Sequence, residues 1–322
     1  MTRMFTLFTS IPPNLSASAI ERQRICVASW RNAGFRPISF NGIAEIPLVQ
    51  SYGLGIEFDS APEGGKPVIV DILQAIRNRG TSHAGIINAD CEIIAYPELA
   101  SRLSRILQGR LLFAERIDRD ANGDLTVGDC QGFDGFFADT TVLSNLTNRH
   151  FRIGETWWDY WLPLAVAANG YEIGCANMPL LLHQQHPTAW HVEKWIEYGR
   201  VFWTQFKNQE VKGRALFAQL GLQYDVTPNT TELLQIGKAC FELLRAQRLS
   251  SPLQLLPEQA GSFALILQGV LPLLTELATT KQALGLARSE LNFVSENKMQ
   301  KMTARIGWLQ KVIGARIRQS LS

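Results

Sequence analysis

Strand-like and helix-like segments alternate in the first part of the chain, and this alternation constrains the fold more than any other feature. Runs rich in β-branched and aromatic residues predict strands, and apolar residues at helical spacing predict helices. The expected order is strand 4–10, helix 15–30, strand 35–40, helix 45–52, strand 54–58, helix 68–79 and a strand that ends at Asn88–Asp90. Strands joined by crossover helices pair in parallel. We therefore expect an α/β fold with a doubly wound, mainly parallel sheet flanked by helices.

Two polar side chains stand where the last of these strands ends. Ile86 and Ile87 lead directly into Asn88-Ala89-Asp90. Side chains two positions apart on an extended chain point the same way. Two such oxygen donors at the carboxyl end of a parallel strand would form a site for Mg²⁺ or Mn²⁺ and a phosphate. A strand that ends in an Asx turn explains the same residues equally well.

Composition sets the class of protein. At 322 residues, the chain has room for one large domain with an appendage, or for two domains. Its apolar fraction of 46% and charged fraction of 19% are typical of a soluble globular protein, and no apolar run approaches the ~20 residues of a membrane span. The five cysteines are odd in number and widely spaced, which favours a reducing compartment over a disulfide framework or a zinc ribbon. We therefore expect a cytoplasmic protein.

The C-terminal end is basic and helical in pattern. From Lys281 onward there are eight Lys or Arg against two Glu. An apolar stripe runs through this stretch, formed by Met302, Ile306, Leu309, Ile313 and Ile317. The stripe predicts either self-association or packing on the protein's own body, or peripheral docking on the inner face of an anionic membrane. Nucleic-acid binding is the least favoured class, because the basic residues are confined to this tail and lack interleaved aromatics.

Two middle segments combine acids with other reactive groups. The segment 153–163 places three Trp and one Tyr among Glu155 and Asp159. It predicts either a buried helix start with both acids on one face or a sugar-binding floor of rings and carboxylates. Further on, His183 ends an apolar run and is a candidate metal ligand or phosphate donor.

One acidic stretch is better explained without a ligand. The stretch 118–129 resembles a calcium loop, but it lacks the final Glu and the flanking helices, so we predict a polar hairpin turn.

The ordered series of features between about Met4 and Trp203 resembles a GT-A glycosyltransferase. Gly65-Lys66 opens a helix that contains Asp71, Gly80 follows, and the next strand ends in Asn88-Ala89-Asp90 at the place of the family's D-x-D motif. The first acid of that motif is here an amide. The resemblance implies a GT-A (Rossmann-like) fold in 1–207, a helical extension in 208–280, and a basic amphipathic helix or coiled coil in 281–322.

The resemblance also assigns roles to single residues. The nucleotide would be held by the end of the first strand, the end of the second strand, and the helix after the third, namely by Thr9, Ser10, Ile11, Asn41, Glu45, Lys66 and Asp71. Asp90, with Asn88, would hold the metal and diphosphate, and His183 would be the late metal ligand. Asp134 would lie near the transferred sugar or acceptor. Asp159, with Glu155 as the second choice, would be the base of an inverting enzyme.

These roles define the expected function. A divalent cation, Mn²⁺ or Mg²⁺, neutralises the leaving nucleotide diphosphate, and a carboxylate takes the proton of the acceptor hydroxyl. The sequence therefore predicts metal-assisted transfer of a sugar from a nucleotide-diphosphate sugar to a polysaccharide, lipid-linked glycan or protein. A degenerate sugar-nucleotide-binding or scaffold protein and a sugar-phosphate nucleotidyltransferase are the alternatives. A nucleotidyltransferase would need a Gly-rich basic loop directly after the first strand, and Thr9-Ser10-Ile11 is not such a loop.

Overall fold

The computed structural model describes residues 5–94, 98–120, 125–126, 132–176, 180–185, 191–208, 218 and 227–247. Compactness divides the chain into two units, Met1–Gly269 and Val270–Ser322, and every described residue belongs to the first. This division differs from the boundaries that we expected after 207 and 280. The predicted basic amphipathic helix lies outside the described residues. In the part of the chain that is described, no helix combines the length and the apolar character needed to cross a bilayer.

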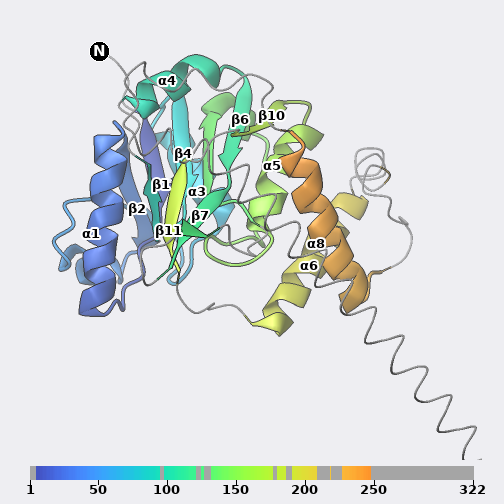
Figure 1. Cartoon of the computed structure of the whole chain (residues 1–322), viewed down its shortest axis with the longest axis horizontal. Coiled ribbons are helices and arrows are strands. Elements are labelled where there is room, and N and C mark those ends of the chain that lie inside the picture. The colour runs from blue at the N-terminus through green and yellow to red at the C-terminus, as the bar shows by residue number, and fades with distance from the viewer. Residues whose placement is uncertain are drawn as a thin grey trace, which may run out of the picture. The chain divides into compact units, whose positions relative to one another are not determined.

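A seven-stranded sheet with the strand order β10-β6-β9-β4-β1-β2-β3 forms the centre of this unit (Figure 1). Its strands are β1 (Thr6–Thr9), β2 (Arg36–Gly42), β3 (Glu57–Ala61), β4 (His83–Ile87), β6 (Arg110–Ala114), β9 (Gly135–Asp139) and β10 (Glu172–Cys175). All neighbours pair in parallel except β9, which runs antiparallel to both β4 and β6. The predicted mixed, mainly parallel α/β sheet is confirmed.

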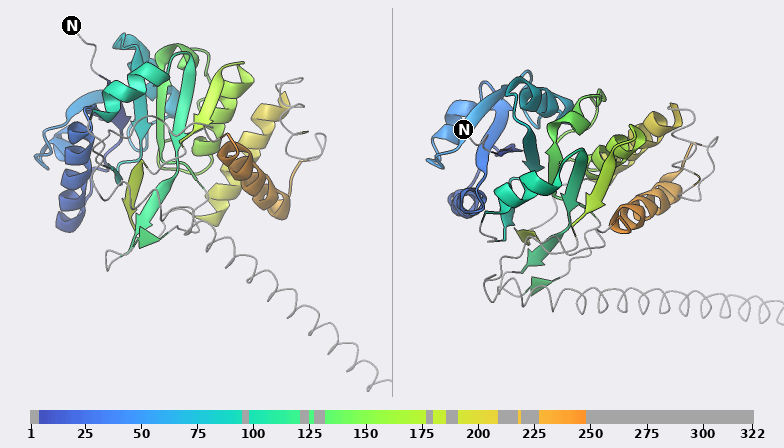
Figure 2. Two further views of the ribbon diagram at one scale, coloured as in Figure 1. Left: turned by 45° about the horizontal axis from the view of Figure 1, so that its top comes forward. Right: turned by 90° about the horizontal axis from the view of Figure 1, so that it is seen from above.

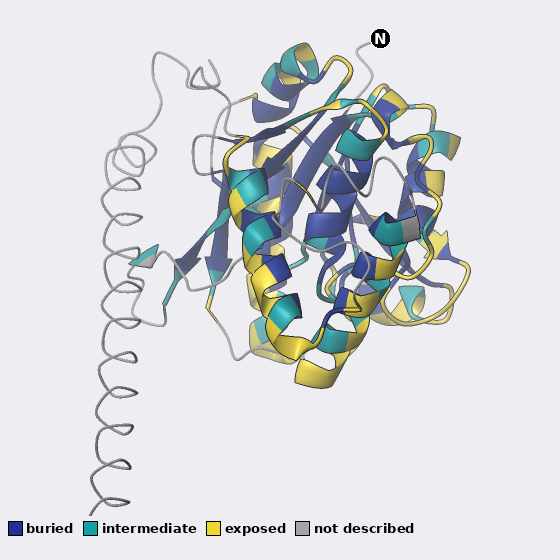
Figure 3. Cartoon of the chain, turned by 90° about the vertical axis from the view of Figure 1, so that its right-hand side faces the viewer, coloured by how far each residue is buried: buried dark blue, intermediate teal, exposed yellow. Residues whose placement is uncertain are grey.

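Helices cover both faces of the sheet (Figure 2). The helices are α1 (Ala17–Asn32), α2 (Ile46–Gln50), α3 (Ile69–Asn78), α4 (Leu99–Ile106), the 3₁₀ turn η1 (Thr140–Leu143), α5 (Trp158–Ala168), α6 (Val192–Asn208) and α8 (Thr230–Arg245). One hydrophobic core lies between the sheet and α3, α5, α6 and α8. The α1 helix packs on the other face through Val27 and Trp30, which are 1% and 0% exposed. Figure 3 shows the strands as the buried layer and the outer helix faces as exposed.

A smaller sheet of four strands is ordered β5-β11-β7-β8. These strands are β5 (Cys91–Ile93), β7 (Arg116–Arg119), β8 (Leu125–Thr126) and β11 (Leu181–Gln184). Strand β4 ends at Ile87 and β5 begins at Cys91, so Asn88–Asp90 follow the end of a strand, as predicted, and lead from the large sheet into the small one. The predicted hairpin over 118–129 is confirmed in that β7 pairs antiparallel with β8.

Local signals explain where several helices begin and end. Ser16 caps α1 by accepting a hydrogen bond from Ala19 N at 3.3 Å. Asn229 and Glu232 form a capping box at the start of α8. The α5 helix begins at Trp158 and carries Pro163 inside it.

Candidate active site

The carboxyl ends of β1, β2, β3 and β4 lie at one edge of the large sheet, because these strands pair in parallel. The antiparallel strand β9 begins at the same edge, which places Asp134 next to the end of β4. Asn88 N donates to Asp134 O at 2.9 Å, and the Asn88 side-chain amide donates to the Asp134 carboxylate. Two residues that the sequence predicted for the site are therefore in direct contact.

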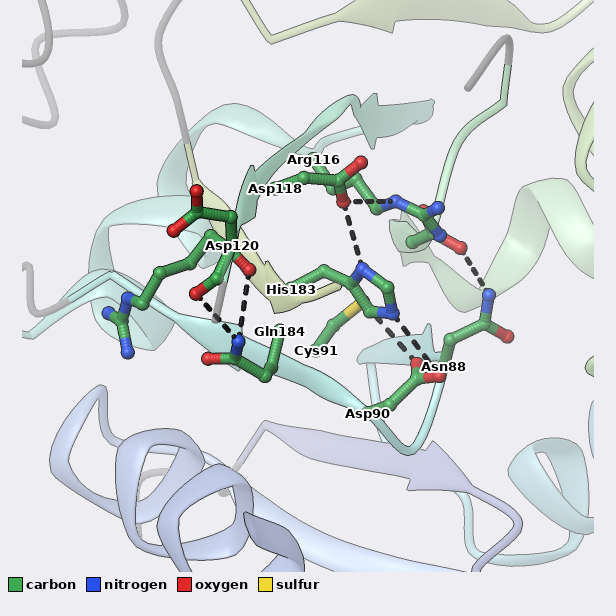
Figure 4. A network of polar contacts seen from close by, with 10 residues as sticks. Asn88, Asp90, Cys91, Arg116, Asp118, Asp120, His183 and Gln184 are labelled. Atoms are coloured by element: carbon green, nitrogen blue, oxygen red, sulfur yellow. Dashed lines mark hydrogen bonds and ion pairs between the residues drawn. The ribbon is translucent and has the colours of Figure 1, made fainter. Parts of the chain in front are cut away.

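The small sheet brings His183 to the same place. Strand β11 lies between β5 and β7, so His183 is paired with Cys91 on one side and Asp118 on the other. His183 Nε2 lies 3.5 Å from Asp90 Oδ2 (Figure 4). Gly135 allows the two sheets to approach here, because a Cβ at this position would lie 2.8 Å from Leu181 Cδ1. The structure thus brings together the two predicted metal ligands, Asp90 and His183.

Asp118 and Arg116 also belong to this site, and sequence reasoning assigned neither of them to it. Asp118 Oδ1 bonds His183 Nδ1 at 2.8 Å. The Arg116 guanidinium lies 3.0 Å from Asp118 Oδ1 through Nε, and its Nη1 donates to Asp134 Oδ2 at 3.0 Å. We call Asn88, Asp90, Arg116, Asp118, Asp134 and His183 the polar ring (Figure 4). One signal in the sequence could have found them: Arg116 and Asp118 are two positions apart on a strand, so their side chains lie on the same face.

The charges within the polar ring are set by its contacts. Burial disfavours the imidazolium form of His183, but hydrogen bonds to Asp118 and Asp90 outweigh it and raise the pKa to about 9. Burial also acts to raise the pKa of Asp118, yet its bonds to His183 and Arg116 win and lower that pKa. Without a cation bound, the site therefore holds the His183 imidazolium between the carboxylates of Asp118 and Asp90.

Asp159 lies in the first turn of α5 and is partly buried. Its Oδ2 accepts a hydrogen bond from Phe133 N at 3.2 Å, next to Asp134. Burial, and then the charge of Asp134, raise the pKa of Asp159 to about 7. A carboxyl group with a pKa near neutrality can accept a proton at physiological pH.

Glu155 precedes the α5 helix, so the prediction that it shares a helix face with Asp159 is wrong. The α5 helix begins only at Trp158, and Trp157 before it has a left-handed backbone with φ of 71°. Glu155 is instead held between two lysines, 3.0 Å from Lys66 Nζ and 3.6 Å from Lys194 Nζ. Its side chain is 8% exposed, so an ion-pair role accounts for its position.

The residues predicted to hold the nucleotide follow β1 and β2. Asn41 Nδ2 donates to Ile11 O at 2.9 Å, and Ile11 N donates to Ser39 Oγ at 3.1 Å. These bonds fix the backbone that follows Thr9 and Ser10. Asn41 is only 1% exposed, so its side chain supports this loop from behind.

Two loops beside that one are joined by Glu45. Its carboxylate accepts from Gly42 N at 3.1 Å and from Gly65 N at 2.8 Å, which ties the end of β2 to the start of the segment containing Lys66. Asp71 is bound by Arg149 through two hydrogen bonds of 2.7 and 2.9 Å. Its carboxylate is therefore engaged in a bidentate ion pair.

The donor set at the polar ring suits a divalent cation that also binds phosphate. Among the described residues, no cluster of three or more His, Cys, Asp or Glu is arranged around a metal position. Mg²⁺ and Mn²⁺ sites in phosphate-handling proteins commonly use one or two protein ligands plus phosphate oxygens and water, and Asp90 and His183 would supply two. Asp118 behind His183 has the place of the carboxylate that orients a metal-binding imidazole. Asn88 Oδ1 is buried and accepts no hydrogen bond from the described residues.

Comparisons with known proteins give only distant likenesses. No family model matches the chain, and no curated protein does. Among solved structures, the chain is similar to S. aureus TarS, with 10% identity, a TM-score of 0.44, and coverage of 66% of this chain and 41% of that one. TarS 1–349 in complex with UDP-GlcNAc gives 11% identity, a TM-score of 0.45, and coverage of 66% and 69%. A putative nucleotide-diphospho-sugar transferase from Desulfovibrio desulfuricans G20 gives 16% identity, a TM-score of 0.35, and coverage of 76% and 99%. The chain thus spans less than half the length of the first of these TarS chains.

Proposed function

We propose that the protein is a glycosyltransferase that moves a sugar from a nucleotide-diphosphate sugar to a hydroxyl acceptor on a polysaccharide, a lipid-linked glycan or a protein. One observation supports this most: Asp90 and His183 meet within 3.5 Å at the carboxyl edge of a parallel sheet. In open α/β sheets, phosphate-bearing ligands bind outside this edge. The nucleotide would lie over the loops that follow β1 and β2, where Thr9 Oγ1 is buried and has no hydrogen-bond partner among the described residues.

In this proposal, Asp90 and His183 hold Mn²⁺ or Mg²⁺, and Asp118 keeps His183 in the orientation that allows it to bind. The ion would neutralise the charge of the diphosphate leaving group. Metal binding requires a neutral imidazole, so His183 would have to give up its proton to hold the ion.

Asp159 is the proposed base of an inverting transfer. It accepts the proton of the acceptor hydroxyl while the acceptor oxygen bonds to the anomeric carbon. The bond from that carbon to the diphosphate breaks, and the electron pair leaves with the diphosphate. Arg116 and Asn88 bind the Asp134 carboxylate. Asp134 would lie near the transferred sugar or the acceptor.

A thermal-shift panel tests the binding step. UDP, GDP, CMP and TDP are each added with and without Mn²⁺, with UDP first because TarS structures hold UDP and UDP-GlcNAc. We expect one nucleotide to stabilise the protein only with Mn²⁺, and Asp90→Asn to abolish that shift. Asp59→Asn is the matched control, since it makes the same change in β3 at a carboxylate paired with Arg79. Equal shifts in both variants would contradict the assignment of Asp90.

A catalytically inactive sugar-nucleotide-binding protein is the second candidate. The observation that favours it is Asn88, whose amide stands in place of an acid and donates to Asp134. Donor hydrolysis separates the two candidates. An enzyme loses hydrolysis in Asp159→Asn while keeping metal-dependent nucleotide binding, whereas an inactive binder shows no hydrolysis in the wild type.

A further inference from the structure

Among the described residues, no strand covers the outer edge of β5. It is the first strand in the order β5-β11-β7-β8, so only one of its edges pairs with a strand. The inward pairing with β11 uses Glu92 and Ile94, because Glu92 faces Leu182 and Ile94 N donates to Leu180 O at 2.9 Å. Backbone groups alternate in direction along a strand. The backbone N–H and C=O groups of Cys91 and Ile93 therefore point away from β11 and toward α1.

Three side chains of α1 bind these outward-facing backbone groups. Trp30 Nε1 donates to Cys91 O at 2.8 Å, and Ser29 Oγ accepts from Ile93 N at 3.0 Å. Gln23 Nε2 donates to Ala89 O at 2.7 Å. One helix thus takes the place of a neighbouring strand along 89–93, and we call these three side chains the α1 clasp.

Gln23 differs from the other two members of the clasp in what it holds. Ser29 and Trp30 bind residues of β5, which β11 also holds. Gln23 binds Ala89, which lies in the turn between β4 and β5, directly between Asn88 and Asp90. Gln23 is a buried amide on a helix face that is otherwise apolar, at 5% exposure beside Cys26 and Val27. A buried amide is costly unless it is bonded, so the contact with Ala89 O accounts for a glutamine at this position.

The Asp90 side chain reaches the polar ring from the turn between β4 and β5. It is 48% exposed, lies 3.5 Å from His183 Nε2 and accepts from Cys91 Sγ at 3.8 Å. The backbone of the turn sets the point from which this side chain reaches those contacts. That turn is closed by Cys91 N, which donates to Asn88 O at 3.2 Å, and anchored to the body of the protein at Ala89.

We propose that Gln23 is a positioning residue that fixes the Ala89 carbonyl and thereby the backbone carrying Asn88 and Asp90 toward the cation and the diphosphate. This inference rests on the proposed function for its ligand, but the contact itself can be tested without any ligand. Gln23 touches no substrate group; it acts through the turn.

Gln23→Met tests the proposal, because methionine keeps the length and apolar volume of the side chain and removes its donor. Gln74→Met is the matched control, since Gln74 is an exposed residue of α3 whose amide donates to Asn78 Oδ1 and accepts from Arg77 Nη2, both at 2.7 Å and both within or next to its own helix turn. With UDP present, we expect Gln23→Met to raise the Mn²⁺ concentration for half-maximal activity ~10-fold, as loss of an outer support of a metal ligand does. The kcat at saturating Mn²⁺ should stay within about twofold, because the catalytic groups are unchanged.

Hydrogen exchange of the metal-free protein provides the second measurement. Gln23→Met should speed exchange in a peptide covering 88–93 and leave peptides from β1 and β2 unchanged, whereas Gln74→Met should change none of them. The proposal is overturned if the two variants behave alike in exchange, or if Gln23→Met lowers kcat without changing the Mn²⁺ requirement. If the wild type shows no Mn²⁺-dependent nucleotide binding, the proposed function fails. In that case, faster exchange at 88–93 in Gln23→Met would still support the anchoring role of Gln23. Unchanged exchange would refute that role.

Discussion

Two aspartates in and beside the polar ring differ in charge preference because their contacts differ. Asp118 bonds an imidazole and a guanidinium, so its pKa is lowered. Burial, and then the like charge of Asp134, raise the pKa of Asp159 to about 7. Paired acids whose environments separate their pKa values take different roles in catalysis. This separation supports the proton-accepting role that we propose for Asp159.

The first prediction concerns the pH dependence of activity. If Asp159 is the base, kcat/KM should rise about tenfold per pH unit below pH 7 and level off above it, because only the carboxylate accepts a proton. Asp159→Asn should lower kcat by at least ~10²-fold. The measurement is a donor-and-acceptor assay between pH 5.5 and 8.5 at saturating Mn²⁺. A profile that stays flat across this range would contradict the assignment.

The same carboxyl group predicts how stability depends on pH. A pKa raised in the folded state means that the native protein binds the proton more tightly than the unfolded chain does. This contribution to stability is present at low pH and is lost as the pH rises through about 7. We therefore expect Asp159→Asn to gain stability over the wild type between pH 5 and pH 8, by ~1 kcal/mol or more. Chemical denaturation at both pH values measures it, and an equal difference at both would count against the burial of this charge.

The pair His183 and Asp118 also makes stability fall as the pH rises, but in a higher pH range. The folded pKa of His183 is raised to about 9, so its contribution is complete below the unfolded value near 6.5 and is lost as the pH rises through 9. Asp118→Asn should cost ~3 kcal/mol at pH 7, because it leaves a buried charge without its partner. The loss should shrink toward pH 10, where the imidazole is neutral. Denaturation at pH 7 and pH 10 gives the comparison, and a loss independent of pH would point to packing alone.

The elements expected from the first 94 residues match the structure closely, whereas the segment before α5 does not. Alternating strands and helices depend on local spacing, which the sequence displays directly. The conformation of Trp157 does not, because a bulky residue with φ of 71° is held by tertiary contacts. Its indole donates to Trp195 O at 2.9 Å and packs against α6 and α8. Only the folded chain reveals this turn, which separates Glu155 from Asp159.

Glycines in α6 and α8 provide the test of that packing. A Cβ at Gly199 would lie 2.9 Å from the Trp157 ring, whereas one at Gly237 would meet its neighbours at 3.5 Å or more. Both glycines lie inside helices, where alanine is favoured by up to ~1 kcal/mol. We expect Gly237→Ala to be neutral or stabilising, and Gly199→Ala to lose ~1–3 kcal/mol through overpacking. Thermal and urea denaturation compare the two, and a stabilised Gly199→Ala would show that the indole can move freely.

At the scale of the whole molecule, the site depends on contacts that local sequence patterns do not contain. The pairing of Asp90 with His183 was expected from the family resemblance. The small sheet that creates it joins segments around 92, 117 and 183, and such long-range pairing leaves no periodic signal. For the same reason, Asp118 was taken for part of a polar turn, and the acid that orients His183 was missed. Sequence reasoning therefore found residues at the ends of strands and missed Arg116 and Asp118, which strand β7 of the second sheet supplies.

The last prediction concerns how much chain the catalytic unit needs. The α8 helix lies beyond the boundary expected at 207, yet Leu233, Ile236, Cys240 and Leu244 are all at most 1% exposed. Phe241 contacts Phe133 at a ring distance of 5.5 Å, and Phe133 is the residue whose amide binds Asp159. Burying each such side chain contributes ~1.5–3 kcal/mol, so the apolar face of α8 is comparable with the total stability of a domain.

A chain that ends at residue 207 should therefore lack a cooperative thermal transition, whereas one that ends at Gly269, the limit of the first compact unit, should keep it. The shorter chain would also expose Phe133 and Asp159 to water, which removes the cause of the raised pKa. Circular dichroism melting of the two chains decides the matter. If the chain ending at 207 melted cooperatively within a few degrees of the longer one, α8 would be an accessory to this fold, and the environment of Asp159 would have to come from α5 and the sheet alone.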